Sequence, residues 1–265
     1  EIGLPLTILE ADNDTRYLLL EMGASGPGHI AYLTDIAPLD VAAVLMVGHA
    51  HMGGFGSVEA VARAKSEIIQ GLRSSGVAIL NADDPRTMAM AELAPGPVFS
   101  FSPSGEPANV RADDVVIGPD GRASFTARTA GASAPVQLQL VGAHHVANAL
   151  AALTIALVVV IDLQAAAQVL SQAQALSPHR MDVRNLSGQL LLIDDSYNAN
   201  IDSVTAALVA LKQLAEGRRK VFVAGQMLEL GDTSEQVHTR TAELAHEAGV
   251  SDILAIGEAA RPLAR

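Results

Sequence analysis

Two short segments place polar side chains directly after apolar runs that are typical of buried strands. In Leu18-Leu19-Leu20-Glu21-Met22-Gly23-Ala24, a carboxylate and a glycine follow a leucine-rich run. The stretch Val47–Ser57 is rich in glycine and carries His49 and His51. Open α/β sheets bind ligands beyond the carboxyl ends of their strands, where carboxylates and neutral imidazoles can hold a metal ion. A solvated strand end explains the first segment equally well. In the second, part of the segment is helix initiation, and a histidine there is more often structural.

Lys65 lies in an alanine-rich stretch whose apolar residues recur at helical spacing. This spacing puts the lysine near the edge of the buried face of a helix. A lysine there is by default a surface residue whose stem lies along apolar neighbours. On this segment alone, that interpretation is preferred.

Two further segments carry several hydrogen-bonding side chains. His144, His145 and Asn148 begin an expected helix, where their donors and acceptors can contact an adenine edge, although a helix cap explains them as well. The stretch Asp194–Asn200 follows an apolar strand and reads Asp-Asp-Ser-Tyr-Asn-Ala-Asn. A turn is the simple explanation, but this set of polar groups exceeds what one Asx-turn uses.

The elements that must position these residues alternate between strands and helices. This alternation predicts an α/β domain built on a mostly parallel sheet with helices on both faces. A β-rich stretch over 109–141, with glycine-rich turns, predicts an antiparallel hairpin region in the same domain. We expect strands at Tyr17–Glu21, Val41–Val47, Val77–Asn81 and Pro97–Phe101, and helices at Ser57–Leu72, Arg86–Leu93, His145–Val159 and Leu163–Ala173.

A second α/β domain is expected to begin at Ser177-Pro178, which gives the domains 1–177 and 178–265. The later pattern is a Rossmann-like βαβαβ succession. Little sequence follows its third strand, so we expect this domain to be incomplete. Its expected elements are a strand at Leu190–Asp194, a helix at Ser203–Leu214, a strand at Lys220–Ala224, a helix at Ser234–Ala248 and a strand at Ile253–Ile256.

Composition excludes several classes of function. The chain has 265 residues, of which 49% are hydrophobic, and a formal net charge of −12. Such a chain should repel nucleic acid. It has no cysteine, which excludes disulfides, cysteine-ligated zinc and a thiol nucleophile, and which suits the cytoplasm. The first residues have neither the basic nor the apolar region of a signal peptide, so we expect none. The longest apolar run, Ala149–Ile161, is too short to span a bilayer. We therefore expect neither a nucleic-acid nor a membrane partner.

Taken in order, the motifs of this chain resemble the Mur ligases over essentially its whole length. Together they are specific, although each alone is weak. The last two, at Asp194–Asn200 and Gly225–Gly231, are most similar to the member of the family that adds a dipeptide. The motifs are Glu-x-Gly-Ala, His-x-x-Gly-Phe-Gly-Ser, Ala-Lys-Ser-Glu-Ile, Leu-Asn-Ala-Asp-Asp-Pro, Gly-x-His-x-x-x-Asn-Ala-Leu-Ala-Ala, Asp-Asp-Ser-Tyr-Asn-Ala-Asn and Gly-x-Met-x-Glu-Leu-Gly.

The resemblance implies a role for each residue. Glu21 and His51 match residues that help hold Mg²⁺, and Lys65 matches a lysine that is carbamylated, which makes it an anionic oxygen ligand suited to a hard cation. In the nucleotide site, His144 belongs to the matching motif, Asn148 matches an adenine contact, Arg180 an arginine near the phosphates and Asp195 the carboxylate that holds the ribose. The wall of the amino-acid and peptide site is implied for Tyr197, Asn198, Asn200, Glu229 and His238.

The implied reaction is ATP-driven amide formation in peptidoglycan precursor synthesis. The carboxylate of a UDP-N-acetylmuramoyl-tripeptide attacks the γ-phosphate to give an acyl phosphate, and the amine of D-alanyl-D-alanine then displaces phosphate. Mg²⁺ and cationic side chains neutralise the charge of the reacting groups. We expect a cytoplasmic monomer that binds these small molecules.

Two departures from the family pattern qualify this expectation. The usual His-Asn pair after glycine is His144-His145 here. The family's phosphate-binding loop and UDP-binding domain lie before the segment matched by Glu1–Leu9, so this chain alone is expected to bind ATP weakly and to be inactive. The alternatives are another Mur-type or folylpolyglutamate-type ligase, or a non-catalytic scaffold fragment.

Overall fold

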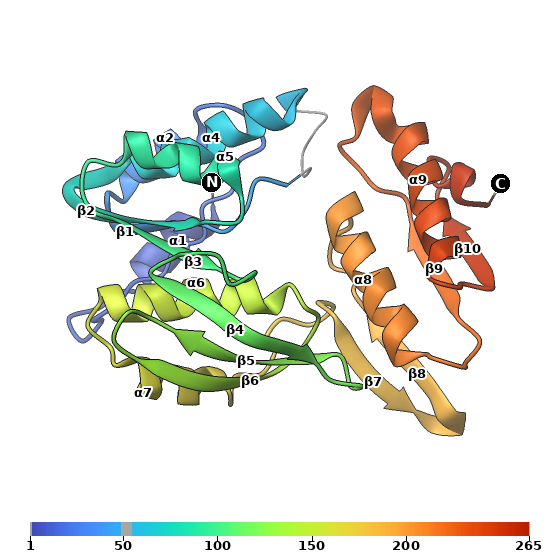
Figure 1. The fold of residues 1–265 in the computed structure, drawn as a ribbon. Helices are drawn as coiled ribbons and strands as arrows, with labels where there is room; N and C mark the ends of the chain where they lie inside the picture. Colours follow the sequence, from blue (N-terminus) through green and yellow to red (C-terminus); the bar gives the residue numbers. More distant parts are fainter. Residues whose placement is uncertain (1, 49–54, 265) are drawn as a thin grey trace.

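The centre of the structure is a six-stranded sheet (Figure 1). The computed structural model describes residues 2–48 and 55–264. The strands lie in the order β1-β2-β3-β4-β5-β6; β1 to β4 are parallel, whereas β5 and β6 run antiparallel to their neighbours. The strands are β1 (Leu39–Val44), β2 (Leu72–Asn81), β3 (Val98–Ser102), β4 (Val110–Ile117), β5 (Arg122–Arg128) and β6 (Ser133–Val141). The α/β class and the antiparallel region over 109–141 are confirmed.

Helices cover both faces of this sheet, because its central strand β2 is apolar on both sides. Ala78 and Leu80 pack into the core beneath α4, while Val77 and Ile79 contribute to the core beneath α6 and α7. This two-sided burial is typical of parallel strands. The helices of this part are α1 (Gly3–Leu9), α2 (His29–Ile36), α4 (Val58–Gln70), α5 (Pro85–Met88), α6 (His145–Val158) and α7 (Leu163–Leu170).

The strand expected at Tyr17–Glu21 is a wrong prediction. Residues 16–24 have no regular secondary structure, and the Leu19 side chain is 84% exposed. A strand is stabilised by pairing, and among the described residues β1 pairs with β2 alone. The leucine-rich run therefore lacks a neighbour that would hold it in a sheet. The helix expected at Arg86–Leu93 is the short α5 followed by a 3₁₀ turn at Ala89–Leu93.

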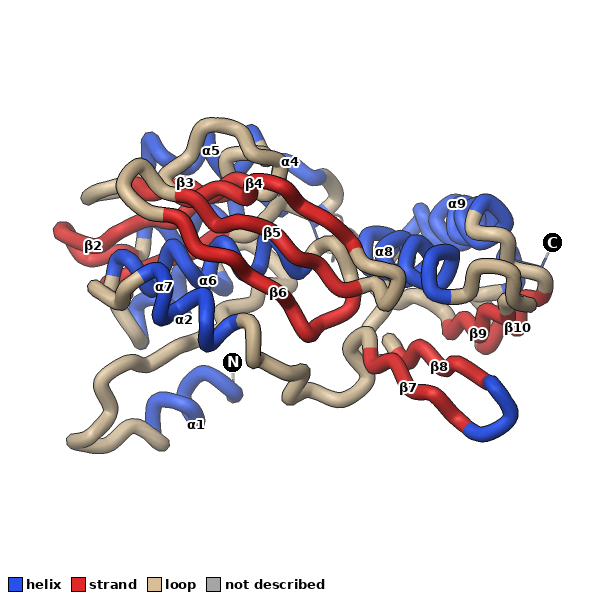
Figure 2. The backbone as a smooth tube through the Cα atoms, turned by 60° about the horizontal axis from the view of Figure 1, so that its bottom comes forward, coloured by secondary structure: helices blue, strands red, loops and turns tan. Residues whose placement is uncertain are grey.

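The C-terminal part contains two small sheets rather than the single sheet that the Rossmann-like pattern suggests. β8 pairs with β7 in an antiparallel hairpin, whereas β9 and β10 form a parallel pair covered by α8 and α9. Figure 2 shows the hairpin projecting away from the two helices. The elements are β7 (Asp182–Leu186), β8 (Leu190–Asp194), α8 (Ile201–Leu214), β9 (Val221–Gly225), α9 (Ser234–Glu247) and β10 (Asp252–Ile256).

The C-terminal part contacts the six-stranded sheet through α8 and β7. Val141 at the end of β6 is buried with Met181 and Ala210 in a small shared core. The side-chain amide of Gln213 donates to the Gly118 carbonyl (2.7 Å) in the turn between β4 and β5. The end of β6 is therefore close to residues 180–183. Within the described ranges, no helix is long and apolar enough to cross a membrane.

Among the described residues whose side chains are completely buried, His238 has the largest polar side chain, with 0% exposure. Its Nε2 accepts from the Met227 N–H (3.0 Å), and its Nδ1 lies 2.7 Å from the Ser234 carbonyl. These contacts fix one tautomer, in which Nδ1 carries the proton and donates. The ring thereby joins α9 to the loop that follows β9.

We predict that His238→Ala lowers the free energy of unfolding by about 2–3 kcal/mol, because it leaves the buried Met227 N–H without an acceptor. Urea unfolding followed by circular dichroism measures the loss, and hydrogen exchange should show faster exchange at Met227. His246→Ala, at an exposed position on the same helix, is the matched control and should change stability by less than about 0.5 kcal/mol. Equal effects of the two variants would contradict the structural role of His238.

Candidate functional site

Lys65 lies at the end of the sheet where β1 and β2 finish. Helix α4 begins at Ser57, whose hydroxyl accepts from the Ala60 N–H (3.2 Å), and Lys65 is half-buried two turns later. Burial lowers the pKa of the Lys65 ammonium, and the nearby Asp84 carboxylate partly opposes this change. Lys65 is therefore not the fully solvated surface lysine that its segment alone suggests.

Asp84 organises the strand ends beside Lys65. Its Oδ2 accepts from the Val47 N–H (2.8 Å) and its Oδ1 from the Arg86 N–H (2.9 Å), so one carboxylate joins the segment after β1 to the start of α5. Asn81 makes a second tie, since its amide donates to the Leu45 carbonyl (2.9 Å). Sequence reasoning gave Asp84 no role, although Asp followed by proline at a helix start is an available signal.

Helix α4 also holds the segment that follows Glu21. The Glu67 carboxylate accepts from the Gly28 N–H (2.7 Å) and the Ala31 N–H (3.0 Å), at the start of α2. Glu67 stands two residues after Lys65, so the lysine and the chain beyond Glu21 are attached to one helix. Glu21 itself is exposed, and His51 lies outside the described residues.

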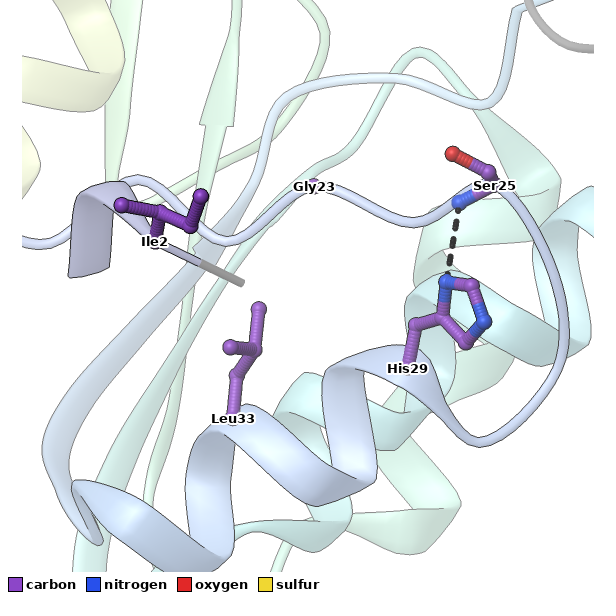
Figure 3. Close-up of a pocket in the computed structure, with 5 residues that line it drawn as sticks. All are labelled: Ile2, Gly23, Ser25, His29 and Leu33. Carbon is purple, nitrogen blue, oxygen red and sulfur yellow. Dashed lines mark hydrogen bonds between the residues drawn. The ribbon is translucent and has the colours of Figure 1, made fainter. Parts of the chain in front are cut away.

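A cavity of about 390 Å³ opens beside the turn after Glu21. Figure 3 shows its lining, in which the Ser25 N–H donates to His29 Nδ1 (3.4 Å). The lining residues are Ile2, Gly23, Ser25, His29 and Leu33. No group of three His, Asp or Glu side chains within residues 2–48 and 55–264 is arranged to hold a metal ion. The exposed Glu21 carboxylate suits a hard cation such as Mg²⁺, whereas a Lys65 ammonium does not.

The rings of the two histidines at the start of α6 lie against each other at a tilt of 40°, and burial favours their neutral forms. Their ring centroids are 4.1 Å apart. Burial lowers the pKa of His145 to about 4, with a smaller effect from the neighbouring His144; burial also lowers the pKa of His144, against an opposing effect of Asp195. Nδ1 of His145 lies 3.5 Å from the Asn148 side-chain amide. Near neutral pH, His145 is therefore a neutral ring next to Asn148.

Gly142 gives His144 the room for this arrangement. Its φ is +121°, a backbone conformation that residues with a side chain rarely adopt. A Cβ at this position would also meet the His144 ring at 2.5 Å. Only glycine therefore allows the ring to lie over the backbone here. This explains in physical terms why a glycine stands two residues before the first histidine.

Arg180 and Asp195, in the C-terminal part of the chain, lie near the two histidines of α6. A cavity of about 340 Å³ lies between the two parts of the chain, lined by His145 and Gln139 on one side and by Arg180 and Asp182 on the other. Asp195 Oδ1 accepts from the Met181 N–H (2.9 Å), and its charge acts on His144. The predicted nucleotide residues His144, Asn148, Arg180 and Asp195 thus form one cluster, in which Asn148 is connected through His145. Neutral ring donors beside a guanidinium suit a ligand that has both a heteroaromatic base and an anionic group.

The residues expected to form a peptide site serve several local purposes. Asn200 caps α8, because its side chain accepts from the Ser203 N–H (2.9 Å) within a capping box. Asn198 accepts from the Ala199 N–H (2.9 Å), and Glu229 has a positive φ of 60° in the loop after β9. His238 is buried and its ring nitrogens are used by the backbone, so it supports that loop from below and offers no surface to a ligand. Tyr197 is exposed.

Comparison with known proteins places these motifs in a family. Residues 1–156 match the Mur ligase middle domain, and residues 179–265 match the Mur ligase glutamate ligase domain. The UDP-N-acetylmuramoyl-tripeptide–D-alanyl-D-alanine ligase of Mycobacterium leprae is 40% identical over 97% of this chain and 54% of its own length. The corresponding Escherichia coli ligase is 36% identical over 97% of this chain and 56% of its own length.

Solved structures agree with the sequence relatives. A crystal structure of MurF from Acinetobacter baumannii is 35% identical with a TM-score of 0.90, over 99% of this chain and 56% of that one. A MurF ligase from Thermotoga maritima in complex with ADP is 27% identical with a TM-score of 0.77, over 96% of this chain and 61% of that one. The chain spans about half the length of the curated relatives it matches. It belongs to the Mur ligase family.

Proposed function

We propose that this chain is part of an ATP-dependent ligase that adds D-alanyl-D-alanine to a UDP-N-acetylmuramoyl-tripeptide through an acyl phosphate. The observation that carries the proposal is that two separate parts of the chain bring their predicted nucleotide residues together. His145 and Arg180 line one cavity, and the charge of Asp195 acts on His144. The names of relatives that match 97% of the chain support these substrates. They do not favour a diamino-acid ligase, a folylpolyglutamate-type ligase or a scaffold. We further propose a cytoplasmic monomer, with its two domains meeting at 177/178.

In this proposal the interdomain cavity takes the nucleotide. Asn148 and His145 contact the adenine edge, Asp195 accepts from the ribose hydroxyls and Arg180 approaches the phosphates. A neutral His145 can donate from Nε2 while Asn148 contacts its Nδ1, so the ring orientation is fixed before a ligand binds. Asn198 and Glu229 border the dipeptide site, which Asn200 and His238 support from within the fold.

Glu21, His51 and Lys65 are proposed to hold Mg²⁺, which when bound would neutralise charge on the phosphates. Lys65 meets this role as a carbamate, formed when its neutral amine takes up carbon dioxide and releases a proton. Burial favours that neutral amine. Asp84 holds the Val47 segment in place beside it. A carbamate adds the oxygen donors that the ammonium lacks.

Phosphate release by the product of the complete reading frame tests the function. With ATP, Mg²⁺ and UDP-N-acetylmuramoyl-tripeptide, we expect release to require D-alanyl-D-alanine as well. Free D-alanine or a diamino acid in its place should give only background release, because the amine substrate must reach the carbonyl in an oriented site. Equal release with single amino acids would indicate another ligase of the family, and none at all would favour a non-catalytic chain.

Lys65→Ala in the same protein should reduce kcat by about 100-fold or more, because it removes an oxygen ligand from the metal site. Added bicarbonate should not rescue this variant, since no amine remains to be carbamylated. Lys212→Ala is the matched control, because Lys212 lies on α8 and donates to the Glu247 carbonyl at the surface. Parent-like activity of Lys65→Ala would remove this lysine from the site.

The low pKa of His145 gives a test that needs no substrate. The folded chain should protonate His145 near pH 4, whereas the unfolded chain does so near its ordinary value of 6.5. The unfolded state therefore binds more protons in this window, and the stability due to neutral His145 is lost as pH falls from about 6.5 to about 4. Proton NMR titration of the imidazole, assigned through His145→Asn, measures the pKa directly.

His145→Asn should weaken the dependence of stability on pH in that window, while His246→Asn, at an exposed position on α9, should leave it nearly unchanged. A measured His145 pKa at its ordinary value would show that the ring is solvated and free to turn. The neutral, oriented donor proposed for the adenine edge would then be absent.

A further inference from the structure

The guanidinium of Arg180 is held by an aromatic ring rather than by a carboxylate. Its central carbon lies 4.1 Å from the centre of the Tyr197 ring. Arg180 is not among the ion pairs that the described residues form, although its neighbour Arg184 pairs with Asp182. Arg180 is exposed and lines the interdomain cavity. Stacking on a ring leaves the N–H donors at the edge of the guanidinium available to an anion.

The backbone on both sides of Arg180 is tied to the loop that carries Tyr197. The His179 carbonyl accepts from the Tyr197 N–H (3.1 Å), and His179 Nδ1 lies 2.7 Å from Asp194 Oδ2. On the other side, the Met181 N–H donates to Asp195 Oδ1 (2.9 Å). Three contacts made by the two flanking residues, His179 and Met181, therefore fix the backbone of Arg180, and the ring of Tyr197 fixes its side chain.

The backbone conformation of residues 179–181 is unusual in a way that is typical of ligand sites. His179 and Met181 have positive φ values of 60° and 48°. Non-glycine residues adopt this region at an energetic cost and gather where surrounding contacts impose it, often beside ligands. Here the contact of His179 with Asp194 and the contact of Met181 with Asp195 hold the two residues in this conformation. Arg180 stands between these two residues, and its side chain lies against the Tyr197 ring.

We propose that Tyr197 is a positioning residue that acts through Arg180. Its ring holds the guanidinium at the edge of the interdomain cavity, so that a phosphate group entering there meets an oriented cation. This inference rests on the proposed function for the identity of the phosphate, which is that of the nucleotide. It gives Tyr197 a role in nucleotide binding, in place of contact with the dipeptide.

Fluorine NMR of the chain labelled with 3-fluorotyrosine tests the stacking without any substrate. The sequence has three tyrosines, and Tyr197→Phe identifies the signal of Tyr197. Arg180→Gln should shift that signal, because it removes the cation from the ring face. Arg184→Gln, four residues later in β7, is the matched control and should not shift it. An unchanged Tyr197 signal in Arg180→Gln would overturn the proposal.

Kinetics of the complete protein test whether Tyr197 contributes to ATP binding through Arg180. Tyr197→Leu should raise KM for ATP by about two- to fivefold, the worth of an exposed cation–π contact, and leave KM for D-alanyl-D-alanine unchanged. Tyr197→Phe keeps the ring and should restore KM for ATP. In an Arg180→Gln background, Tyr197→Leu should add nothing further, because the group through which it acts is gone.

A rise in KM for the dipeptide alone, or equal damage by Tyr197→Phe and Tyr197→Leu, would overturn the positioning role. Failure of the proposed function would give a result distinct from failure of the positioning role. The parent protein would then release no phosphate with the two substrates, while the fluorine signals of the labelled chain would still decide whether Tyr197 holds Arg180.

Discussion

Burial of β2 on both of its faces is the constraint on which the rest of the structure depends. Alternate residues of this strand enter two different cores, Ala78 and Leu80 beneath α4 and Ile79 beneath α6. Full burial of a Leu or Ile side chain stabilises the fold by about 1.5–3 kcal/mol, and a shift of one residue in register would exchange the two faces. The register of β2 against β1 and β3 is therefore fixed, and with it the place where each strand ends.

The polar groups at those ends follow from the same constraint. A strand that leaves a buried sheet exposes backbone donors and acceptors that need partners, since an unpaired one costs about 1–3 kcal/mol. Asn81 and Asp84 supply them by bonding to Leu45 and Val47 across the sheet. Because Asp84 is committed to the backbone, its charge stays beside Lys65. The requirement for paired backbone groups and the electrostatics of the candidate metal site are thus met by one side chain.

Local pattern predicted most of the architecture, because period-two and helical spacing record burial directly. β8, α4, α6 and α9 lie close to their expected ranges, and the antiparallel stretch over 109–141 is present. The failures concern partners distant in sequence. The run at Tyr17–Glu21 has strand composition but no paired neighbour, and β8 pairs with β7 instead of joining β9 and β10. Composition predicts the tendency of a segment to be a strand, whereas pairing depends on the rest of the chain.

In the candidate site, too, the sequence predicted the residues but not which of them lie together. The motifs located the polar residues, but only the fold shows that His144 lies within the field of Asp195 and that the cavity joins His145 to Arg180. The fold also separates residues that the resemblance assigned to one peptide site, because His238 is completely buried while Tyr197 is exposed.

In a chain whose net charge is −12, an arginine near so many carboxylates would readily pair with one and lose its capacity for an anionic ligand. Asp194 and Asp195 stand close to Arg180, yet Asp194 is engaged by His179 and Ser196, and one oxygen of Asp195 accepts from the Met181 N–H. The acids that shape the connection are thereby kept from the guanidinium, and an uncharged ring takes their place beside it. An acidic protein can retain a cation for an anionic ligand in this way, by satisfying its carboxylates elsewhere.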